Sequence, residues 1–202
     1  MYSSAKSGIK MVFIAEILSL INVLVAGLTS LSAAGAVVAF SAGMAALSGL
    51  FGIIGLVLSV ASLILTFVGL SKANEDNATF GKAVAIIILR IVVAIVGAIL
   101  GLIPFLGAII KFLCGLLDAV LSYVVVKLIV SGCAGLDISF SAKANTITTL
   151  ALVSMIISIA SSVIGIIPVI GAIIGAICGL INLIVSIVFY ILYLSFLGAF
   201  SK

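Results

Sequence analysis

Two long stretches without a charged residue constrain this chain more than any other feature. Residues 17–71 and 144–201 contain no Asp, Glu, Lys or Arg. Each stretch is longer than 50 residues, whereas one helical crossing of a bilayer takes roughly 20 residues. Each stretch therefore has to supply at least two crossings' worth of transmembrane helix, and a soluble fold is excluded.

The composition of the whole chain agrees with a membrane solvent. Of its 202 residues, 66% are hydrophobic and 7% are charged, and the mean hydropathy is +1.67. Nine Lys and Arg against five Asp and Glu give a net charge of +4. These charges form neither the basic block nor the pattern of interleaved aromatics that nucleic-acid binding requires, so no nucleic-acid partner is expected.

The residues that carry most catalytic and metal chemistry are missing or dispersed. The chain has no His, and Cys114, Cys133 and Cys178 are too far apart in sequence to form a C-x-x-C site. Their odd number favours reduced thiols in apolar surroundings. Neither a nucleophile paired with a base, nor a phosphate loop, nor a pair of catalytic carboxylates is recognisable. We therefore expect a protein that is not an enzyme and that holds no cofactor or metal.

The N-terminus resembles a secretory signal. Lys6 and Lys10 precede an apolar run, and residues 32–36 read Ser-Ala-Ala-Gly-Ala, which is typical of a cleavage site. Glu16 lies inside the apolar run. Because a signal core carries no charge, we expect this segment to be a retained first transmembrane helix.

Polar loops divide the chain into three similar units. The loops at residues 71–77 and 137–145 separate units at about 6–73, 78–137 and 142–200. Residues 101–122 and 165–186 are identical at 11 of 22 positions, with a constant offset of 64 residues. The first unit is more divergent, but its Gly52 and Ser59 are spaced like Gly115 and Ser122 of the second.

Each unit has to turn back on itself once. An apolar run from 83 to 130 would be about 70 Å long as one helix, against about 30 Å of hydrocarbon. Pro104 and Pro168, each flanked by glycines, are the expected turns, and the corresponding turn of the first unit is expected at 29–35. The sequence thus predicts an all-α, polytopic integral membrane protein, with six transmembrane helices in three tandem helical-hairpin repeats that form a single transmembrane domain. The expected helices are 9–29, 36–70, 81–102, 105–131, 146–166 and 169–199.

Lysines mark one side of the membrane. They gather at one set of predicted helix ends, while the three opposite turns carry no charge; these lysines are Lys6, Lys10, Lys72, Lys82, Lys127, Lys143 and Lys202. By the positive-inside rule, both termini are expected in the cytoplasm. Tyr190 and Tyr193 are expected to anchor the last helix near the cytoplasmic surface.

Small and polar residues form stripes along the predicted helices. They recur at intervals of three or four residues, which places them on one helix face. The three main stripes comprise Gly52, Gly55, Ser59 and Ser62; Gly107, Lys111, Gly115, Asp118 and Ser122; and Gly171, Gly175, Gly179, Asn182 and Ser186. Such stripes favour close packing of helices in lipid, and the alternative is that they surround a watery path.

Charged residues inside the membrane form a predicted network. Arg90 and Asp118 each lie fourteen residues from Pro104, so an antiparallel hairpin brings them to the same depth. Because a lone charge at that depth costs at least about 3 kcal/mol, we expect a salt bridge between them. The network also includes Glu16, Lys111 and Asn182. It acts either as a structural staple or as an ion or proton relay.

Two short segments carry a resemblance to known proteins. The chain ends one predicted helix with Gly-Leu-Ser-Lys-Ala at 69–73 and restarts with Phe-Gly-Lys-Ala at 80–83. In this it resembles uncharacterised multi-pass membrane proteins of Gram-positive bacteria. The resemblance implies a bacterial inner membrane and brings no activity.

Two functions follow from the sequence. The favoured hypothesis is a structural or accessory membrane subunit that oligomerises with its own copies, or docks to another membrane protein within the lipid, because the chain has almost no mass outside the membrane. The alternative is a small channel or transporter for an ion or small solute, with the Gly/Ser/Asp/Asn stripe as its path.

Overall fold

The structure is a computed structural model in which residues 2–39, 42–103, 106–164 and 170–202 are described. This part of the chain is all-helical and contains no strand. The elements are α1 (Ser3–Ala39), α2 (Ala42–Ala73), α3 (Ala78–Leu100), α4 (Leu106–Leu136), the short 3-10 helix η1 (Ile138–Phe140), α5 (Ser141–Ile164) and α6 (Ile170–Phe200).

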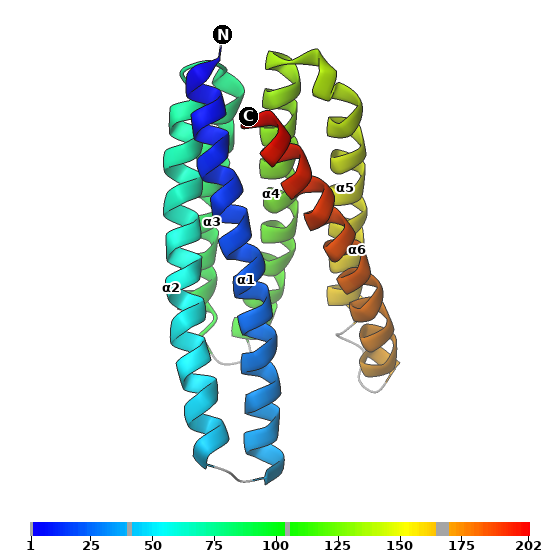
Figure 1. Cartoon of the computed structure of the whole chain (residues 1–202). Helices are drawn as coiled ribbons and strands as arrows, with labels where there is room; N and C mark the ends of the chain where they lie inside the picture. The colour runs from blue at the N-terminus through cyan, green and yellow to red at the C-terminus, as the bar shows by residue number, and fades with distance from the viewer. Residues whose placement is uncertain (1, 40–41, 104–105, 165–169) are drawn as a thin grey trace.

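The six long helices form a ring in the order of the sequence. Each helix packs against the next one along the chain, and α6 returns to contact α1. Figure 1 shows both termini at the same end of the bundle, with α6 crossing obliquely toward α1 at that end. The ring therefore closes between the first and the last helix.

The outer surface of the ring is strongly apolar. Five segments of the described helices are long and apolar enough to cross a membrane, and the described part of α6 adds a shorter apolar stretch, Ile184–Phe200. Large aliphatic side chains stand exposed along these helices, including Leu56, Ile99 and Ile191. Lipid is the solvent that such a surface requires, so the structure is consistent with a membrane location.

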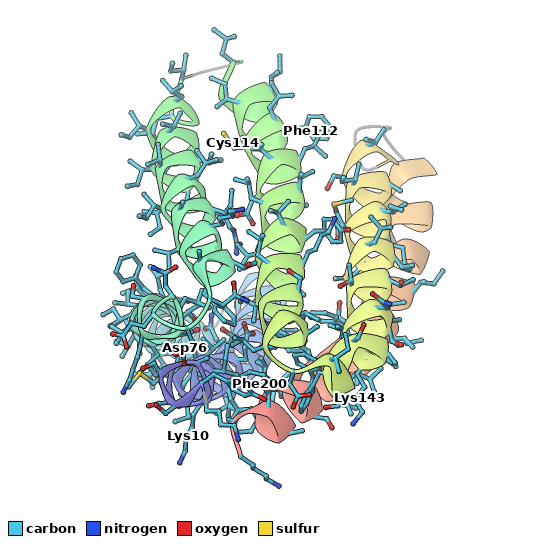
Figure 2. All side chains as sticks on the ribbon, turned by 90° about the horizontal axis from the view of Figure 1, so that it is seen from above. Lys10, Asp76, Phe112, Cys114, Lys143 and Phe200 are labelled. Atoms are coloured by element: carbon cyan, nitrogen blue, oxygen red, sulfur yellow. The ribbon has the colours of Figure 1, made fainter. Side chains whose placement is uncertain are left out.

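Among the described residues, the main hydrophobic core lies at the end that carries the termini. Figure 2 shows Lys10, Asp76, Lys143 and Phe200 near this end, and Phe112 and Cys114 at the opposite one. The largest fully buried side chains are Ile9, Val12, Leu70, Phe80, Ile129, Val130, Cys133, Tyr193, Phe196, Leu197 and Phe200. They make one cluster to which all six long helices contribute, with Ala144 and Ile147 coming from α5. The bundle is thus sealed by a hydrophobic core at one end.

Polar caps hold the loops of this end in place. The carboxylate of Asp76 accepts a hydrogen bond of 2.7 Å from the backbone N–H of Ala5, in the first turn of α1. Asn77 caps α3 by accepting from the N–H of Thr79 at 2.9 Å. Its amide nitrogen also donates to the carbonyl of Gly132 in α4, at 3.1 Å. The loop between α2 and α3 therefore ties three helices together.

Helices α1 and α2 approach each other closely where two glycines face each other. A Cβ atom added to Gly8 would collide with the carbonyl oxygen of Gly69, and one added to Gly69 would lie 3.0 Å from the Cβ of Met11. This reciprocal contact is what small residues allow when helices pack in lipid. The stripes predicted from the sequence include neither glycine.

One predicted turn is wrong. Residues 29–35, expected to reverse the chain, are helical and belong to α1, which is 37 residues long. Glycine inside a helix costs only about 1 kcal/mol, and this segment has no proline to remove a backbone donor. Pro104 and Pro168 lie outside the described residues. Residues 101–103 follow α3 as a turn. The N–H of Gly107, in the first turn of α4, donates to the carbonyl of Ile103 at 2.7 Å.

Candidate functional site

A cavity of about 480 Å³, lined by both polar and apolar side chains, lies inside the ring, between α1, α2, α3, α4 and α6. The charged, hydroxyl and amide side chains on its wall are Glu16, Ser19, Asn22, Ser59, Ser62, Thr66, Arg90, Asp118, Ser122, Tyr190 and Tyr193. Ile87 and Val125, which also line it, belong to the hydrophobic core. The cavity is therefore closed by packed side chains on the side of the termini.

The predicted salt bridge between Arg90 and Asp118 is present. Nε of Arg90 donates to Oδ1 of Asp118 at 2.8 Å, and Nη2 donates to Oδ2 at 3.1 Å. The pair joins α3 to α4 in the two-pronged geometry that arginine forms with a carboxylate. The side chains are 34% and 48% exposed. Both residues lie in helices that are long and apolar enough to cross a membrane, and both line the cavity.

Hydroxyl groups form the α1–α2 wall of the cavity. Ser62 Oγ donates to the carbonyl of Ala15 at 3.0 Å, so its contact of 2.7 Å with Ser19 Oγ has Ser19 as the donor. Thr66 Oγ1 donates to the carbonyl of Ser62 at 2.9 Å. Each of these three hydroxyl groups thus donates its hydrogen bond to an acceptor within the protein.

The same wall continues away from the core through Asn22. Its amide nitrogen donates to Ser59 Oγ at 2.8 Å, and Ser59 Oγ in turn donates to the carbonyl of Gly55 at 2.9 Å. A Cβ atom at Gly55 would lie 3.0 Å from the amide oxygen of Asn22. Glycine at this position therefore makes room for the asparagine.

Within the described part of the chain, Glu16 and Tyr193 lie on the wall without a hydrogen-bond partner. Glu16 is half-buried and lies within electrostatic range of Arg90. Among the described residues its carboxylate has neither a hydrogen bond nor a salt bridge. The hydroxyl of Tyr193 is buried and has no hydrogen-bond partner within the same part of the chain. Both residues line the cavity, so they offer unsatisfied polar groups to whatever occupies it.

Tyr190 and Tyr193 do not have the position expected from the sequence. They were predicted to anchor α6 at the membrane surface, but both line the cavity, and Tyr193 is only 1% exposed. Their helix, α6, runs obliquely toward α1 (Figure 1) and contacts it. The prediction of surface anchoring is wrong for Tyr193.

A second cavity, of about 310 Å³, lies on the other side of α4. It is lined by Gly115, Ser154 and Ser158, and it shares Asp118 and Ser122 with the central cavity. Asp118 and Ser122 therefore line both cavities. These two residues belong to one predicted stripe of α4, and that stripe thus contributes to the walls of both cavities.

The remaining predicted residues divide into four groups. Gly107 packs directly against the backbone of Gly101 at the start of α4. Gly52 and Gly115 are exposed, and an added Cβ would meet nothing within 4 Å at either position in the described part of the chain. Ser186 is half-buried on α6. The side-chain surroundings of Lys111, Gly171, Gly175, Gly179 and Asn182 lie outside the described residues.

Several wall residues were not in the predicted network. Ser19 and Asn22 follow Glu16 at intervals of three residues on α1, and this spacing is the signal that places all three on one face. Thr66 extends the α2 stripe by one helical turn beyond Ser62. Tyr193 gives no such signal, because its inward position depends on the tilt of α6.

The charges of the described wall do not cancel. Glu16 and Asp118 contribute two negative charges and Arg90 one positive charge, which leaves one negative charge when all three are ionised. Among the described residues, no group of three or more His, Cys, Asp and Glu could hold a metal ion. The described wall thus offers one carboxylate, Glu16, beyond the Arg90–Asp118 pair.

Comparison with known proteins gives no relative. No protein-family model matches the sequence, no curated protein matches it, and no solved structure matches the fold.

Proposed function

We propose that this chain is a small transporter or channel: a non-enzymatic, multi-pass membrane protein that takes an ion or small solute through the centre of its helix ring. The central cavity supports this most strongly, because polar side chains from α1, α2, α3, α4 and α6 converge on it at membrane depth. Its volume is within the range of small-molecule sites. In a dry packing seam the ion pair would be buried between the helices, whereas the side chains of Arg90 and Asp118 are partly exposed.

The cavity is closed at one end, which favours a gated mechanism over an open pore. The core side chains that close it come from all the long helices and lie at the end that carries the termini. Passage to that side would require this core to open. Asp118 and Ser122, between the two cavities, lie where α4 could move relative to its neighbours. Alternating access around a central site has this general form.

The membrane and orientation belong to the same proposal. All lysines except Lys111 belong to the helix ends on the side of the termini, so the positive-inside rule places this closed end in the cytoplasm. The resemblance of residues 69–73 and 80–83 to Gram-positive membrane proteins favours a bacterial inner membrane. The three hairpins α1–α2, α3–α4 and α5–α6 correspond to three tandem repeats, for which the identity between residues 101–122 and 165–186 is the support.

Flux through reconstituted liposomes tests the proposal. Purified protein is incorporated into vesicles, and the movement of labelled monovalent ions and of small amines and acids is followed against vesicles without protein. We expect flux of at least one of them, and Asp118→Asn should reduce it because it breaks the pair with Arg90. Glu75→Gln is the matched control, since it removes one negative charge from an exposed loop residue. Absence of flux for every species would contradict the proposal.

A second candidate is the oligomerising subunit favoured by the sequence. Gly52 is an exposed glycine with open space around it in the described structure, and such a position allows a helix of another copy, or of another membrane protein, to approach closely. Native mass spectrometry of the protein with bound lipid checks this. Gly52→Leu should convert an oligomer to a monomer if this surface is used, and an unchanged mass would remove the candidate.

A further inference from the structure

We propose that the part of the central cavity next to the core binds a small organic cation, an alkylammonium, with Glu16 as its counter-ion. The inference rests on the proposed function, because it names the class of solute that the same cavity would carry. Four independent features of the wall support it.

The first feature is the charge distribution. Arg90 uses two of its nitrogens on Asp118, at 2.8 and 3.1 Å, so these two charges largely compensate each other. Glu16 has no such partner among the described residues and faces the same space. A carboxylate at membrane depth needs a positive charge or water close by. A cation in the cavity would meet this need, whereas an anion would be repelled.

The second feature is the polarity of the hydroxyl wall. Ser62 and Thr66 donate their hydrogens to backbone carbonyls, and Ser59 does the same further out. What these hydroxyls can still offer to the cavity is the lone pairs of their oxygens. Such a wall accepts hydrogen bonds, which suits the N–H groups of an ammonium.

The third feature is the buried hydroxyl of Tyr193. Most buried polar groups in proteins have a hydrogen-bond partner, but this one has none in the described structure. It lines the cavity on α6, and Phe189 stacks on its ring with 5.3 Å between centroids. Phe189 and Tyr190 line the cavity as well. Aromatic rings beside a carboxylate are the usual surroundings of a bound organic ammonium.

The fourth feature is size. The cavity of about 480 Å³ is far larger than the space of a dehydrated metal ion, since even a water molecule occupies only about 30 Å³. Its wall also mixes aromatic and aliphatic side chains, such as Leu63 and Ile91, with the polar ones. An alkylammonium matches both parts, with its charged nitrogen at Glu16 and its carbon chain on the apolar surface.

Equilibrium binding in lipid nanodiscs tests the inference without requiring transport. The chain contains no Trp, and two of its four tyrosines, Tyr190 and Tyr193, line the cavity. The tyrosine emission of the protein therefore reports on the cavity. Butylammonium chloride is titrated into the full-length protein, with sodium chloride and sodium butyrate as comparison salts. We expect saturable binding of butylammonium and none of butyrate. Glu16→Gln should weaken it by about tenfold or more, the value of a lost charged hydrogen bond.

Two further variants make the result decisive. Glu75→Gln removes the same charge outside the cavity and should leave the affinity unchanged. Tyr193→Phe removes only the buried hydroxyl and should weaken binding by about threefold; it serves as the test if Glu16→Gln does not fold. Equal affinity of Glu16→Gln and the unaltered protein would overturn the site, and so would equal affinity of Tyr193→Phe if only that variant folds. Sodium binding as strong as that of butylammonium would overturn the organic class.

The binding and flux assays fail separately. Binding of butylammonium without flux would keep the site and contradict the transport function. Flux of some other species without butylammonium binding would keep the transport function and overturn this inference.

Discussion

Removing the arginine of the Arg90–Asp118 pair should have a moderate cost, because the pair faces a polar cavity. The two hydrogen bonds, at 2.8 and 3.1 Å, involve charged groups on both sides. Fully buried hydrogen bonds to charged groups contribute about 1.5–3 kcal/mol each, and exposed ion pairs contribute about 0–1 kcal/mol. With side chains 34% and 48% exposed, the pair lies between these limits. We expect a coupling energy of about 1.5 kcal/mol.

The cost of the single variant distinguishes a hydrated cavity from a dry seam. In Arg90→Ala, the carboxylate of Asp118 loses its partner. If water fills the cavity, this carboxylate is solvated and the free energy of unfolding should fall by about 2 kcal/mol. If the site is dry, an uncompensated charge at membrane depth costs about 3–5 kcal/mol. The measured cost therefore reports on the surroundings of the pair.

A double-mutant cycle measures both quantities. Unfolding of the unaltered protein, Arg90→Ala, Asp118→Ala and the double variant is followed in lipid–detergent micelles. The expected result is a coupling energy near 1.5 kcal/mol and folded single variants. A cost of 4 kcal/mol or more for Arg90→Ala, or about zero coupling, would refute the reasoning.

Three other predictions follow from the packing and the caps. Gly8→Val should lower the free energy of unfolding by about 3 kcal/mol, because its side chain would collide with the backbone of α2, whereas Gly52→Val, which has open space, should change it little; thermal unfolding of both variants checks this. Tyr193→Phe should raise the stability of the ligand-free protein by about 1 kcal/mol, since it removes an unpartnered buried hydroxyl, and a loss of stability would show that the hydroxyl is bonded to internal water. The hydroxyl and the backbone N–H of Ser139 hold the pKa of Asp137 below its ordinary value of 3.8, so the ionised carboxylate should stabilise the fold at neutral pH and lose this effect as the pH falls through its lowered pKa. The stability advantage over Asp137→Asn, measured by unfolding across this range, should disappear on acidification, and a constant difference would contradict this interpretation.

The salt bridge could be predicted from the sequence because it depends on hairpin register alone. The fourteen-residue spacings from Pro104 place Arg90 and Asp118 at one level whatever the angles between hairpins. The helical class and the apolar spans follow equally directly from the uncharged stretches. These features depend on distances along the chain, which a sequence contains.

Other features depend on how whole helices cross, and the sequence does not encode them locally. Tyr193 lies on the cavity wall and is buried, on a helix, α6, that runs obliquely toward α1 (Figure 1). The contact between Gly8 and Gly69 likewise depends on where α1 and α2 meet. The length of α1 was missed for a different reason, because small residues at 29–35 are compatible with a turn and with a helix alike.

Access of a water-soluble reagent to the cavity tests the central claim most directly. In a variant without native cysteines, Ser122→Cys places a thiol on the wall of both cavities. Leu117→Cys, on the same helix but 44% exposed on the apolar surface, is the matched control. A charged methanethiosulfonate reagent added to the protein in nanodiscs should modify the first thiol and leave the second, lipid-covered thiol unmodified. Protection of Ser122→Cys would show a dry seam and contradict the account.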